Sequence, residues 1–565
     1  MTSSRADTLV TCLAAAPSNP ERGFHFKNLE GGERFYSFAS LLGESERRAA
    51  QLAALGVRQG DRVALVIADP AEFVLTFLAA AVGGMVPVPI YPRASFKAKN
   101  AYVDTVSHIV RAAGAKLLVA AESAKPVMEE VLARDLSDVR LALLDELHAV
   151  QADVRDGKPE REIRPDDLCF LQFTSGSTSM PKGVMVSHGN LVANARAFLG
   201  PGGLDRTDDD LAVGWLPLYH DMGLIGFVLG TLICDIRTVL IPTEAFGRRP
   251  NVWLEAMHQH HATITFAPNF AYALATKRAR DRDLEGLDLS KLRVAGCGAE
   301  PINPKVMREF AQRFARCGFR AEALMPAYGM AEATLAISFH ANPAPLITDT
   351  VDVAAMKQGQ ATPRAADPAQ PQATVELVCC GAPFPDHEVK IVDEQGRSLP
   401  ERSVGEIWTR GPSITQGYYG NPEASEAAFG QGWLRTGDLG YIASGLIYVC
   451  GRSKDLIIIR GANFYPQDLE WAVSEVEGVR RDNVVAFSVL RDGEETLIIS
   501  AEGNSSDAPA LRKSIAAKVA ETAGLSVGHV AVVRIGSLPK TSSGKVQRRR
   551  TKALFEDGLL EEHPH

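Results

Sequence analysis

Small hydroxyl-bearing residues and glycine fill the segment from Phe173 to Gly183, which directly follows a stretch with the apolar pattern of a β-strand. Their size lets backbone N–H groups approach an anion, the hydroxyls add donors, and Lys182 supplies a positive charge. The segment therefore predicts a phosphate-binding loop, although a polar surface turn has the same composition. It is not a Walker A loop, because glycine rather than serine or threonine follows Lys182. The candidate phosphate-binding residues are Thr174, Ser175, Gly176, Ser177, Thr178 and Lys182.

Two further clusters of polar side chains favour surface roles. Histidines crowd the segment from Met257 to His261, but Glu255 is the only carboxylate close by, and the spacing matches neither H-E-x-x-H nor a zinc finger. We therefore expect a solvated helix edge there. Arg548 to Arg550, with Lys552, form a basic run that is typical of a solvated face. The same run could instead steer an acidic carrier protein to this end of the chain.

The order of apolar segments predicts the elements that must position these residues. Apolar positions at helical spacing from Phe38 predict a helix that ends at Gly56, where glycine suits a left-handed cap, and a second helix is expected over 70–81. Strands then alternate with helices, a rhythm typical of parallel or mixed sheets covered on both faces. The expected strands lie at 63–68, 86–90, 116–120, 139–144, 168–173, 238–241 and 263–266.

Two later segments depart from this rhythm. The segment from Ile347 to Thr374 is rich in Ala, Gln, Pro and Asp, so we expect an insertion or linker that contributes little to a core. The chain after Asp455 predicts a separate α+β unit with strands at 456–459, 484–490, 496–501 and 530–535 and a helix at 508–522. The predicted fold class is therefore α/β, with a large N-terminal body of packed mixed sheets and helices plus a small, mobile α+β C-terminal lid.

Composition and charge narrow the class of protein. Hydrophobic residues make up 46% of the 565 residues and charged residues 23%, which predicts a soluble globular protein and excludes collagen-like, disordered and disulfide-stapled classes. A formal net charge of -8 gives no general attraction to nucleic acid. Glycines and prolines interrupt the longest apolar stretch, Phe77 to Ile90, so no membrane span is predicted.

The N-terminal residues and the cysteines both bear on the cellular location of the protein. Residues from Leu9 to Ala16 predict an amphipathic helix rather than a signal peptide, because Asp7 and a single Arg5 make a poor charged leader. The eight cysteines include no C-x-x-C pair. We read them as reduced thiols in a cytoplasmic protein.

Several segments, which follow one another along nearly the whole chain, resemble the motifs of a known family. The loop at 173–183 resembles the signature of the adenylate-forming superfamily, which comprises acyl-CoA synthetases, luciferases and nonribosomal adenylation domains. The other motifs that carry the resemblance are Gly298-Ala299-Glu300-Pro301, Tyr328-Gly329-Met330-Ala331-Glu332, Trp433-Leu434-Arg435-Thr436-Gly437-Asp438, Gly451-Arg452 and Pro539-Lys540-Thr541-Ser542-Ser543-Gly544-Lys545.

Finer details resemble one branch, the long-chain fatty acyl-AMP ligases. The polar segment 347–374 lies where these ligases carry an insertion. The motifs that carry this likeness are Leu218-Tyr219-His220-Asp221-Met222-Gly223-Leu224, Ala331-Glu332-Ala333-Thr334, Lys454-Asp455-Leu456-Ile457-Ile458 and Asn463-Phe464-Tyr465-Pro466-Gln467-Asp468-Leu469-Glu470.

The resemblance implies roles for individual residues. Lys545 would contact both the acyl carboxylate and the α-phosphate, a task that needs positive charge because the acid is already ionised at neutral pH. Glu332 would hold Mg²⁺, Asp438 would accept the ribose hydroxyls, and Tyr328 would pack on adenine. Each has an ordinary alternative: a basic-tail cation, a helix-start carboxylate, a turn aspartate and a core tyrosine.

The remaining implied site residues surround the nucleotide and the acyl entrance. His220 would contact or gate the acyl carboxylate, although a lone histidine is more often structural. Asp221 lies near the position where amino-acid-activating relatives anchor an ammonium, but its surrounding pattern matches the fatty-acid branch. The other implied ATP-binding residues are Gly298, Ala299, Glu300, Pro301, Ala327, Gly329, Met330 and Arg452.

The function that the resemblance implies is activation of a fatty acid with ATP to acyl-AMP and pyrophosphate, followed by transfer to the phosphopantetheine thiol of an acyl carrier protein. The carrier would be a separate polypeptide of the polyketide synthase or nonribosomal peptide synthetase type, since no carrier domain is visible. An acyl-CoA synthetase shares every ATP motif and is the main rival. A nucleotide-sensing protein without catalysis is a second, weakened by the presence of Lys545, Glu332 and Asp438.

The resemblance also predicts the domain arrangement. An adenylating domain would span residues 1–453, and a lid of residues 454–565 would turn about a hinge at Lys454 between the two half-reactions. The insertion at about 347–374 would restrain that rotation and disfavour free CoA, whereas an inert surface loop fits its polar composition equally well.

Overall fold

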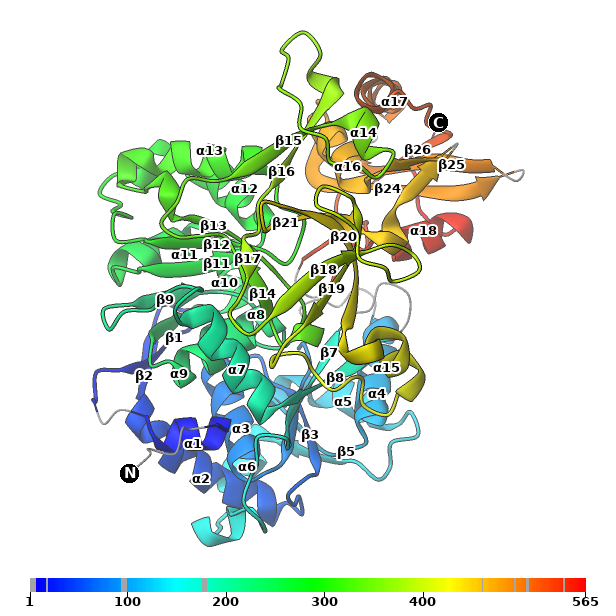
Figure 1. The fold of residues 1–565 in the computed structure, drawn as a ribbon. Coiled ribbons are helices and arrows are strands. Elements are labelled where there is room, and N and C mark those ends of the chain that lie inside the picture. The colour runs from blue at the N-terminus through cyan, green and yellow to red at the C-terminus, as the bar shows by residue number, and fades with distance from the viewer. Residues whose placement is uncertain are drawn as a thin grey trace.

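The computed structural model describes residues 7–16, 19–92, 99–174, 180–459, 461–491, 494–504, 508–541 and 544–564. Among these residues, several packed sheets and their helices form a large body, and a smaller α+β unit lies at one end of it (Figure 1). The α/β class expected from the sequence is confirmed. In the described part of the chain, no helix is long and apolar enough to cross a bilayer. All eight cysteines carry free thiols.

The largest sheet forms the centre of the body. Its middle strands are parallel and buried, as their continuous apolar runs predict, while β2, β14 and β17 add antiparallel edges. Within the described residues its spatial order is β17 (Ala382–Pro383), β14 (Ala336–Phe339), β13 (Leu324–Gly329), β12 (Val294–Cys297), β11 (Ile264–Ala267), β9 (Leu211–Gly214), β10 (Arg237–Leu240), β1 (Gly23–Lys27) and β2 (Glu33–Ser37).

The N-terminal strands and helices confirm the sequence predictions. Helix α2 (Phe38–Ala54) is followed by Gly56 at φ +94°, and α3 (Pro70–Val82) begins with Asp69 accepting the N–H of Glu72. A parallel sheet contains β4 (Val86–Pro89), β3 (Arg62–Val66), β5 (Ala115–Ala120) and β6 (Arg140–Leu143). A separate antiparallel pair consists of β7 (Leu168–Thr174) and β8 (Lys182–Ser187), and an antiparallel sheet consists of β18 (Glu388–Val392), β19 (Gly405–Arg410), β20 (Leu434–Ala443) and β21 (Leu446–Arg452).

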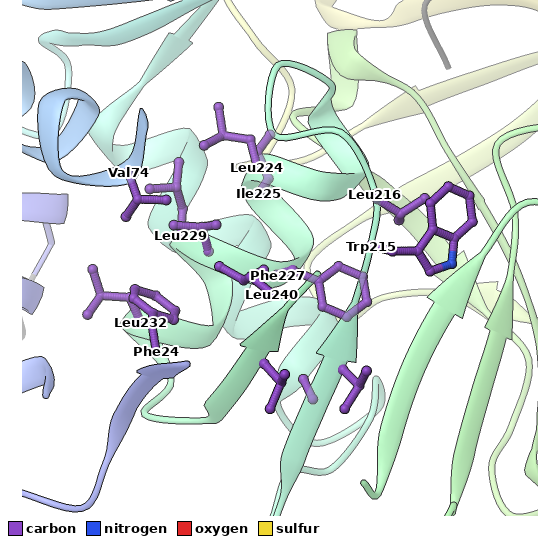
Figure 2. Close-up of a cluster of buried hydrophobic side chains, with 14 of the residues drawn as sticks. Phe24, Val74, Trp215, Leu216, Leu224, Ile225, Phe227, Leu229, Leu232 and Leu240 are labelled. Carbon is purple, nitrogen blue, oxygen red and sulfur yellow. The ribbon is translucent and has the colours of Figure 1, made fainter. Parts of the chain in front are cut away.

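A largely buried helical segment lies between β9 and β10 in the chain. It comprises α8 (Asp221–Leu224), one π-helical turn (Ile225–Leu229) and α9 (Gly230–Ile233). Figure 2 shows its Leu229 and Leu232 beside Val74 and Phe24. A π-turn rotates the residues that follow it, and such turns are frequent at functional sites. This segment also forms a wall of the cavity described below.

The segment 347–374 packs more than its composition suggests, and the expectation that it adds little to a core was wrong. It forms β15 (Thr348–Asp352), paired with β16 (Thr374–Val378), and the short helix α14 (Val353–Met356). Val351, Met356 and Ala361 are each at most 3% exposed and pack with tyrosines of the body and the C-terminal unit. A few well-placed apolar residues are enough to anchor an otherwise polar segment.

The C-terminal unit has a hydrophobic core of its own. Strand β25 pairs antiparallel with β24 and parallel with β26. The unit contains β22 (Ile457–Ile459), β23 (Ala462–Phe464), α16 (Pro466–Ser474), β24 (Val479–Arg491), β25 (Glu494–Gly503), α17 (Ala508–Ala523), β26 (His529–Val533) and α18 (Arg548–Glu556).

Truncating Met356 tests the packing of the inserted segment. We expect Met356→Ala to lower the free energy of unfolding of the body by about 2–5 kcal/mol, because it leaves a cavity among buried side chains. Chemical denaturation followed by tryptophan fluorescence measures the change. Gln358→Ala, an exposed neighbour in the chain, is the matched control and should change little. Equal stability of the two variants would show that the segment is not part of the core.

Asp468 in the first turn of α16 predicts a pH-dependent stability. Its Oδ1 is buried without a hydrogen-bond partner in the described structure, and burial raises the carboxyl pKa from 3.8 to about 7. The folded chain thus binds this proton more tightly than the unfolded chain does, so stability falls as pH rises from about 4 to about 7.

Asp468→Asn should therefore raise the thermal midpoint at pH 8 and leave it nearly unchanged at pH 4, as measured by differential scanning fluorimetry. Asp208→Asn, whose side chain is 91% exposed, is the control. A gain of equal size at both pH values would contradict the assignment.

Candidate active site

The predicted motifs converge where the parallel strands of the largest sheet end. The turn after β12 carries Gly298 and Ala299, the end of β13 carries Tyr328 and Gly329, and the segment after β9 leads to His220. In parallel sheets the carboxyl ends of neighbouring strands meet at one edge, which is where ligands usually bind. Lys545 reaches the same place from the C-terminal unit and lines a small space together with His220 and Ala299.

The contact of Lys545 spans the two units of the chain. Its Nζ donates to the carbonyl oxygen of Ala299 at 2.6 Å. Burial lowers the pKa of the Lys545 amine, and the carboxylates of Glu300 and Asp221 oppose that change. These two carboxylates therefore help to keep a positive charge at the strand ends.

The Ala299 turn has an unusual backbone that presents its carbonyl. Ala299 itself adopts φ +67°, a left-handed conformation that costs energy for a residue with a Cβ. A Cβ on the preceding Gly298 would lie 2.9 Å from the carbonyl oxygen of Ala327, which explains the need for glycine. Glu300 stabilises the far side of the turn by accepting the N–H of Phe270 at 2.8 Å. Pro301 follows on the exposed surface.

His220 and Asp221 form a close pair beside Lys545. The Nδ1 of His220 lies 2.5 Å from Asp221 Oδ1, and the backbone N–H of Met222 donates to the same oxygen at 2.7 Å. Burial raises the pKa of Asp221, but His220 and Lys545 together bring it below the usual value. The Asp221 carboxylate is thus already engaged by groups of the chain.

Tyr328, Asp438 and Arg452 form a second polar group. The Tyr328 hydroxyl donates to Asp438 Oδ2 at 2.8 Å, and Arg452 Nε lies 3.3 Å from Asp438 Oδ1. Burial raises the pKa of Asp438, while Arg452 and Tyr328 oppose the rise. This arrangement places an acceptor-only group on β20 beside an aromatic ring on β13.

Glu332 connects to the predicted phosphate loop through a residue that the sequence analysis missed. The Tyr418 hydroxyl donates to Glu332 Oε1 at 2.7 Å, and Lys182 Nζ lies 5.0 Å from the centre of the Tyr418 ring. Burial raises the pKa of Glu332. Nothing near Tyr418 in the sequence signals this role, since its partner lies 86 residues away.

Thr174 and Lys182 border the predicted phosphate loop on its two sides. Thr174 ends β7 and pairs in register with Lys182 at the start of β8. The two residues that border the loop are therefore held beside each other by this strand pair. The loop residues Ser175, Gly176, Ser177 and Thr178 lie outside the described residues. Ala327 and Met330 flank Tyr328 and Gly329 on and just after β13.

An apolar cavity of about 70 Å³ leads away from the strand ends. Asp221, Ala299 and Tyr328 lie at one end of its lining, while Ile264, the first residue of β11, lies at the other. The cavity therefore runs back along the sheet toward the amino ends of the strands. The other side chains that narrow it are mainly large and apolar, namely Phe198, Leu199, Leu204, Phe227, Ile236, Phe266, Leu335 and Phe339.

The basic run before the C-terminus is used within the chain. Arg548 pairs with Asp455 at 2.7 Å and with Glu470 at 2.8 Å, and Arg549 contacts the same aspartate at 3.2 Å. Neither side of the earlier alternative fits these two arginines, because they are neither solvated cations nor free for an acidic partner. They fix the segment after Lys545 to α16 and to the residues after Arg452.

The histidines between Met257 and His261 form no metal centre. Among the described residues, no group of three or more His, Cys, Asp or Glu side chains is placed to hold a metal ion. His258 accepts the N–H of Asp288, and His260 lies 3.4 Å from Glu33. These contacts are those of a polar surface.

Comparison with known proteins matches nearly the whole chain to two family models and to a relative of similar length. A family model described as AMP-binding enzyme matches residues 14–419, and one described as Disco-interacting protein 2-like, AMP domain, matches 454–564. A Caulobacter vibrioides protein named as an acyl-CoA synthetase is 37% identical over 557 residues, covering 98% of this chain and 96% of that one.

Two further relatives are named for fatty acids. The medium-chain-fatty-acid–[acyl-carrier-protein] ligase JamA of Moorena producens is 32% identical, covering 94% of this chain and 92% of its own. A solved structure from a study of fatty acyl-adenylate ligases of E. coli and L. pneumophila superposes with a TM-score of 0.91 at 31% identity, covering 98% of each chain.

Proposed function

The chain belongs to the AMP-binding enzyme family, and we propose that it activates a fatty acid with ATP and then passes the acyl group to an acyl carrier protein. The proposal is supported by two relatives, which are named as a fatty acid–carrier protein ligase and a fatty acyl-adenylate ligase. The acceptor thiol would be the phosphopantetheine of a separate carrier.

The apolar cavity beside Lys545 is the observation that carries the proposal. An alkyl chain lying in it would place its carboxylate at the Ala299 end, within reach of the Lys545 ammonium. An amino acid would need a free anion to pair with its ammonium, but His220 already engages Asp221 at 2.5 Å. The lining therefore favours an acid without a second charge.

The first half-reaction requires charge stabilisation rather than a base. A carboxylate oxygen attacks the α-phosphorus of ATP, an oxygen–phosphorus bond forms, and pyrophosphate leaves with the electrons of the bond that breaks. Lys545 would face the oxygens on which negative charge accumulates, and the lowered pKa caused by its burial would rise again beside phosphate. His220, at the same entrance, would contact the acyl carboxylate.

The nucleotide would lie along the strand ends. We assign Tyr328 to the adenine, Asp438 to the ribose hydroxyls and Arg452 to the hydrogen-bond network behind Asp438, because the hydroxyl and guanidinium already orient that carboxylate. Thr174 and Lys182 border the loop assigned to the phosphates. The turn from Gly298 to Pro301 and residues 327–330 would complete the nucleotide pocket.

Glu332 suits a magnesium ion that is bound mainly by phosphates. It is a single buried carboxylate, and Mg²⁺ in such sites takes one or two carboxylates while substrate phosphates and water supply the remaining ligands. Tyr418 would orient the carboxylate through its hydroxyl. When bound, the ion would neutralise phosphate charge during attack.

The second half-reaction would use a different orientation of the C-terminal unit. The carrier thiol attacks the acyl carbonyl carbon and forms a carbon–sulfur bond, while its proton passes to solvent. AMP leaves with the electrons of the carbon–oxygen bond that breaks. We propose that residues 1–453 form the adenylating domain and 454–565 a lid that turns at Lys454, where the backbone leaves β21 and a second core begins.

The inserted segment is positioned to restrain that rotation. Lys357 Nζ donates to the carbonyl oxygen of Ala523 at 3.4 Å and lies 4.6 Å from the ring centre of Phe464. Its carbonyl oxygen accepts the N–H of Asn463 at 3.3 Å. These contacts join the insertion to two parts of the lid, which supports a carrier rather than free CoA as acceptor.

The function is tested by offering the purified protein ATP, Mg²⁺ and a mixture of fatty acids, with and without CoA and candidate holo carrier proteins. We expect pyrophosphate release that depends on fatty acid, and mass spectrometry should detect acyl-AMP and acyl carrier protein with little acyl-CoA. Fast conversion to acyl-CoA would favour the synthetase reading. Nucleotide binding without pyrophosphate release would favour a sensor.

Lys545→Ala separates the two half-reactions. We expect acyl-AMP formation to fall about a hundredfold or more, because the variant loses the charge that faces the α-phosphate. Transfer from supplied acyl-AMP to a carrier should change far less, as measured by intact-protein mass spectrometry. Lys552→Ala, which pairs only with Glu556 among the described contacts, is the control. Equal loss in both steps would contradict the assignment of Lys545.

Lys357→Met tests the restraint on the lid. Excision of the whole insertion would remove buried Val351 and Met356, so a point change is the cleaner experiment. We expect a higher ratio of acyl-CoA to acyl-AMP in the presence of CoA, because the lid turns more freely. Arg364→Met breaks an ion pair with Asp352 inside the insertion and is the matched control. An unchanged ratio in well-folded Lys357→Met would refute the restraint by this residue.

A further inference from the structure

The hairpin that carries Lys545 begins beside a carboxylate buried in the core of the C-terminal unit. Glu502, near the end of β25, is 0% exposed. Its Oε1 accepts the backbone N–H of Leu538 at 3.1 Å, and its Oε2 lies 2.9 Å from Arg480 Nη1. The neighbouring strand residues on that face, Ser500 and Ile498, are equally buried. A charge there costs folding free energy unless hydrogen bonds and an opposite charge compensate it.

Leu538 is the residue from which the hairpin departs. The next residue, Pro539, accepts the N–H of Gln547 at 2.8 Å, and Thr541 exchanges two hydrogen bonds with Lys545, at 2.7 and 3.1 Å. Lys540 and Val546 form an antiparallel bridge between these contacts. The position of Lys545 is therefore coupled through a short ladder to the backbone N–H that Glu502 holds.

The second arm of the hairpin is fixed by other carboxylates. It leads directly into α18, where Arg548 pairs with Glu470 and Asp455. The hairpin is thus held at both bases by acidic side chains: Glu470 on α16 and Asp455 in the turn after β21 at one base, and Glu502 on β25 at the other. Only the β25 anchor acts on the backbone rather than on a side chain.

We propose that Glu502 is a positioning residue for adenylation: it holds the Leu538 N–H so that the hairpin delivers Lys545 Nζ to the Ala299 carbonyl. The inference rests on the proposed role of Lys545 in acyl-AMP formation. Glu502 acts through Lys545 and touches neither substrate nor nucleotide. Loss of its carboxylate frees the first arm of the hairpin and lowers the fraction of lids with Lys545 in place.

Glu502→Leu and Glu502→Gln test the proposal. We expect Glu502→Leu to lower kcat for acyl-AMP formation about tenfold to a hundredfold, with little change in KM for ATP and in transfer from supplied acyl-AMP. Glu502→Gln should retain more activity than Glu502→Leu, because its amide oxygen still accepts the Leu538 N–H. The Arg480 side chain is 44% exposed and can turn to water, so the lid should fold in both variants.

Two controls separate positioning from general stability. Glu562→Gln removes a carboxylate that pairs with His529 at 2.8 Å in the same unit, outside the hairpin, and should leave the half-reactions unchanged. Hydrogen exchange should show loss of protection at the bonded N–H groups of Leu538, Thr541, Lys545 and Gln547 in Glu502→Leu and not in Glu562→Gln. Exchange that rises throughout the lid would overturn the proposal in favour of a structural role.

A double-mutant cycle with Lys545→Ala gives the decisive comparison. If Glu502 acts through Lys545, the double variant is no slower in acyl-AMP formation than Lys545→Ala alone. Multiplicative losses would overturn the proposal, and so would full adenylation by a folded Glu502→Leu protein. A Lys545→Ala variant that adenylates normally would instead overturn the proposed function, so the two failures are distinguishable.

Discussion

The site is built around one contact, a hydrogen bond from a lysine ammonium to a carbonyl oxygen. The two groups belong to units that each have a hydrophobic core of their own. The carbonyl belongs to Ala299, in a left-handed turn at the end of a central parallel strand, and the ammonium belongs to Lys545 of the C-terminal unit. Neither unit alone contains both the cation and the cavity. The parallel sheet therefore supplies a fixed reference edge, and the smaller unit must be docked in register with that edge for the site to be complete.

Electrostatics near that contact is a balance of burial against opposite charge. Burial alone favours the neutral form of Lys545, Glu332 and Asp438, and each is set beside a group that limits the change. Tyr418 and Tyr328 contribute hydroxyl donors rather than charges, so they orient carboxylates without neutralising them. The result is a polar edge that stays ready for a charged ligand while an apolar cavity lies directly behind it.

Local sequence signals predicted the helices and strands well, and they predicted contacts between residues far apart in the sequence poorly. The helix over 70–81 was predictable because its start, with Asp69 and Pro70, is encoded within a few residues. The contact of Tyr418 with Glu332 joins residues 86 apart, and no local pattern encodes it. The insertion misled for a related reason: its average composition is polar, yet three of its apolar residues, Val351, Met356 and Ala361, are buried in a core cluster. Likewise Arg548 and Arg549 looked like parts of a surface patch, because their partners Asp455 and Glu470 lie far away in the chain.

The contacts that hold both bases of the Lys545 hairpin bear on how the two proposed half-reactions would alternate. A lysine on a loose loop could leave the strand ends while the rest of the C-terminal unit stayed in place. Adenylation and transfer would then not be separated by a movement of the whole unit. Here backbone and arginine contacts tie the ammonium to β25, α16 and α18, so in the proposed rotation it would move together with these three elements. In the proposed second half-reaction, a rotation of the C-terminal unit large enough to admit a thiol would therefore withdraw the Lys545 ammonium from the strand ends, so the two proposed half-reactions could not occur at the same time.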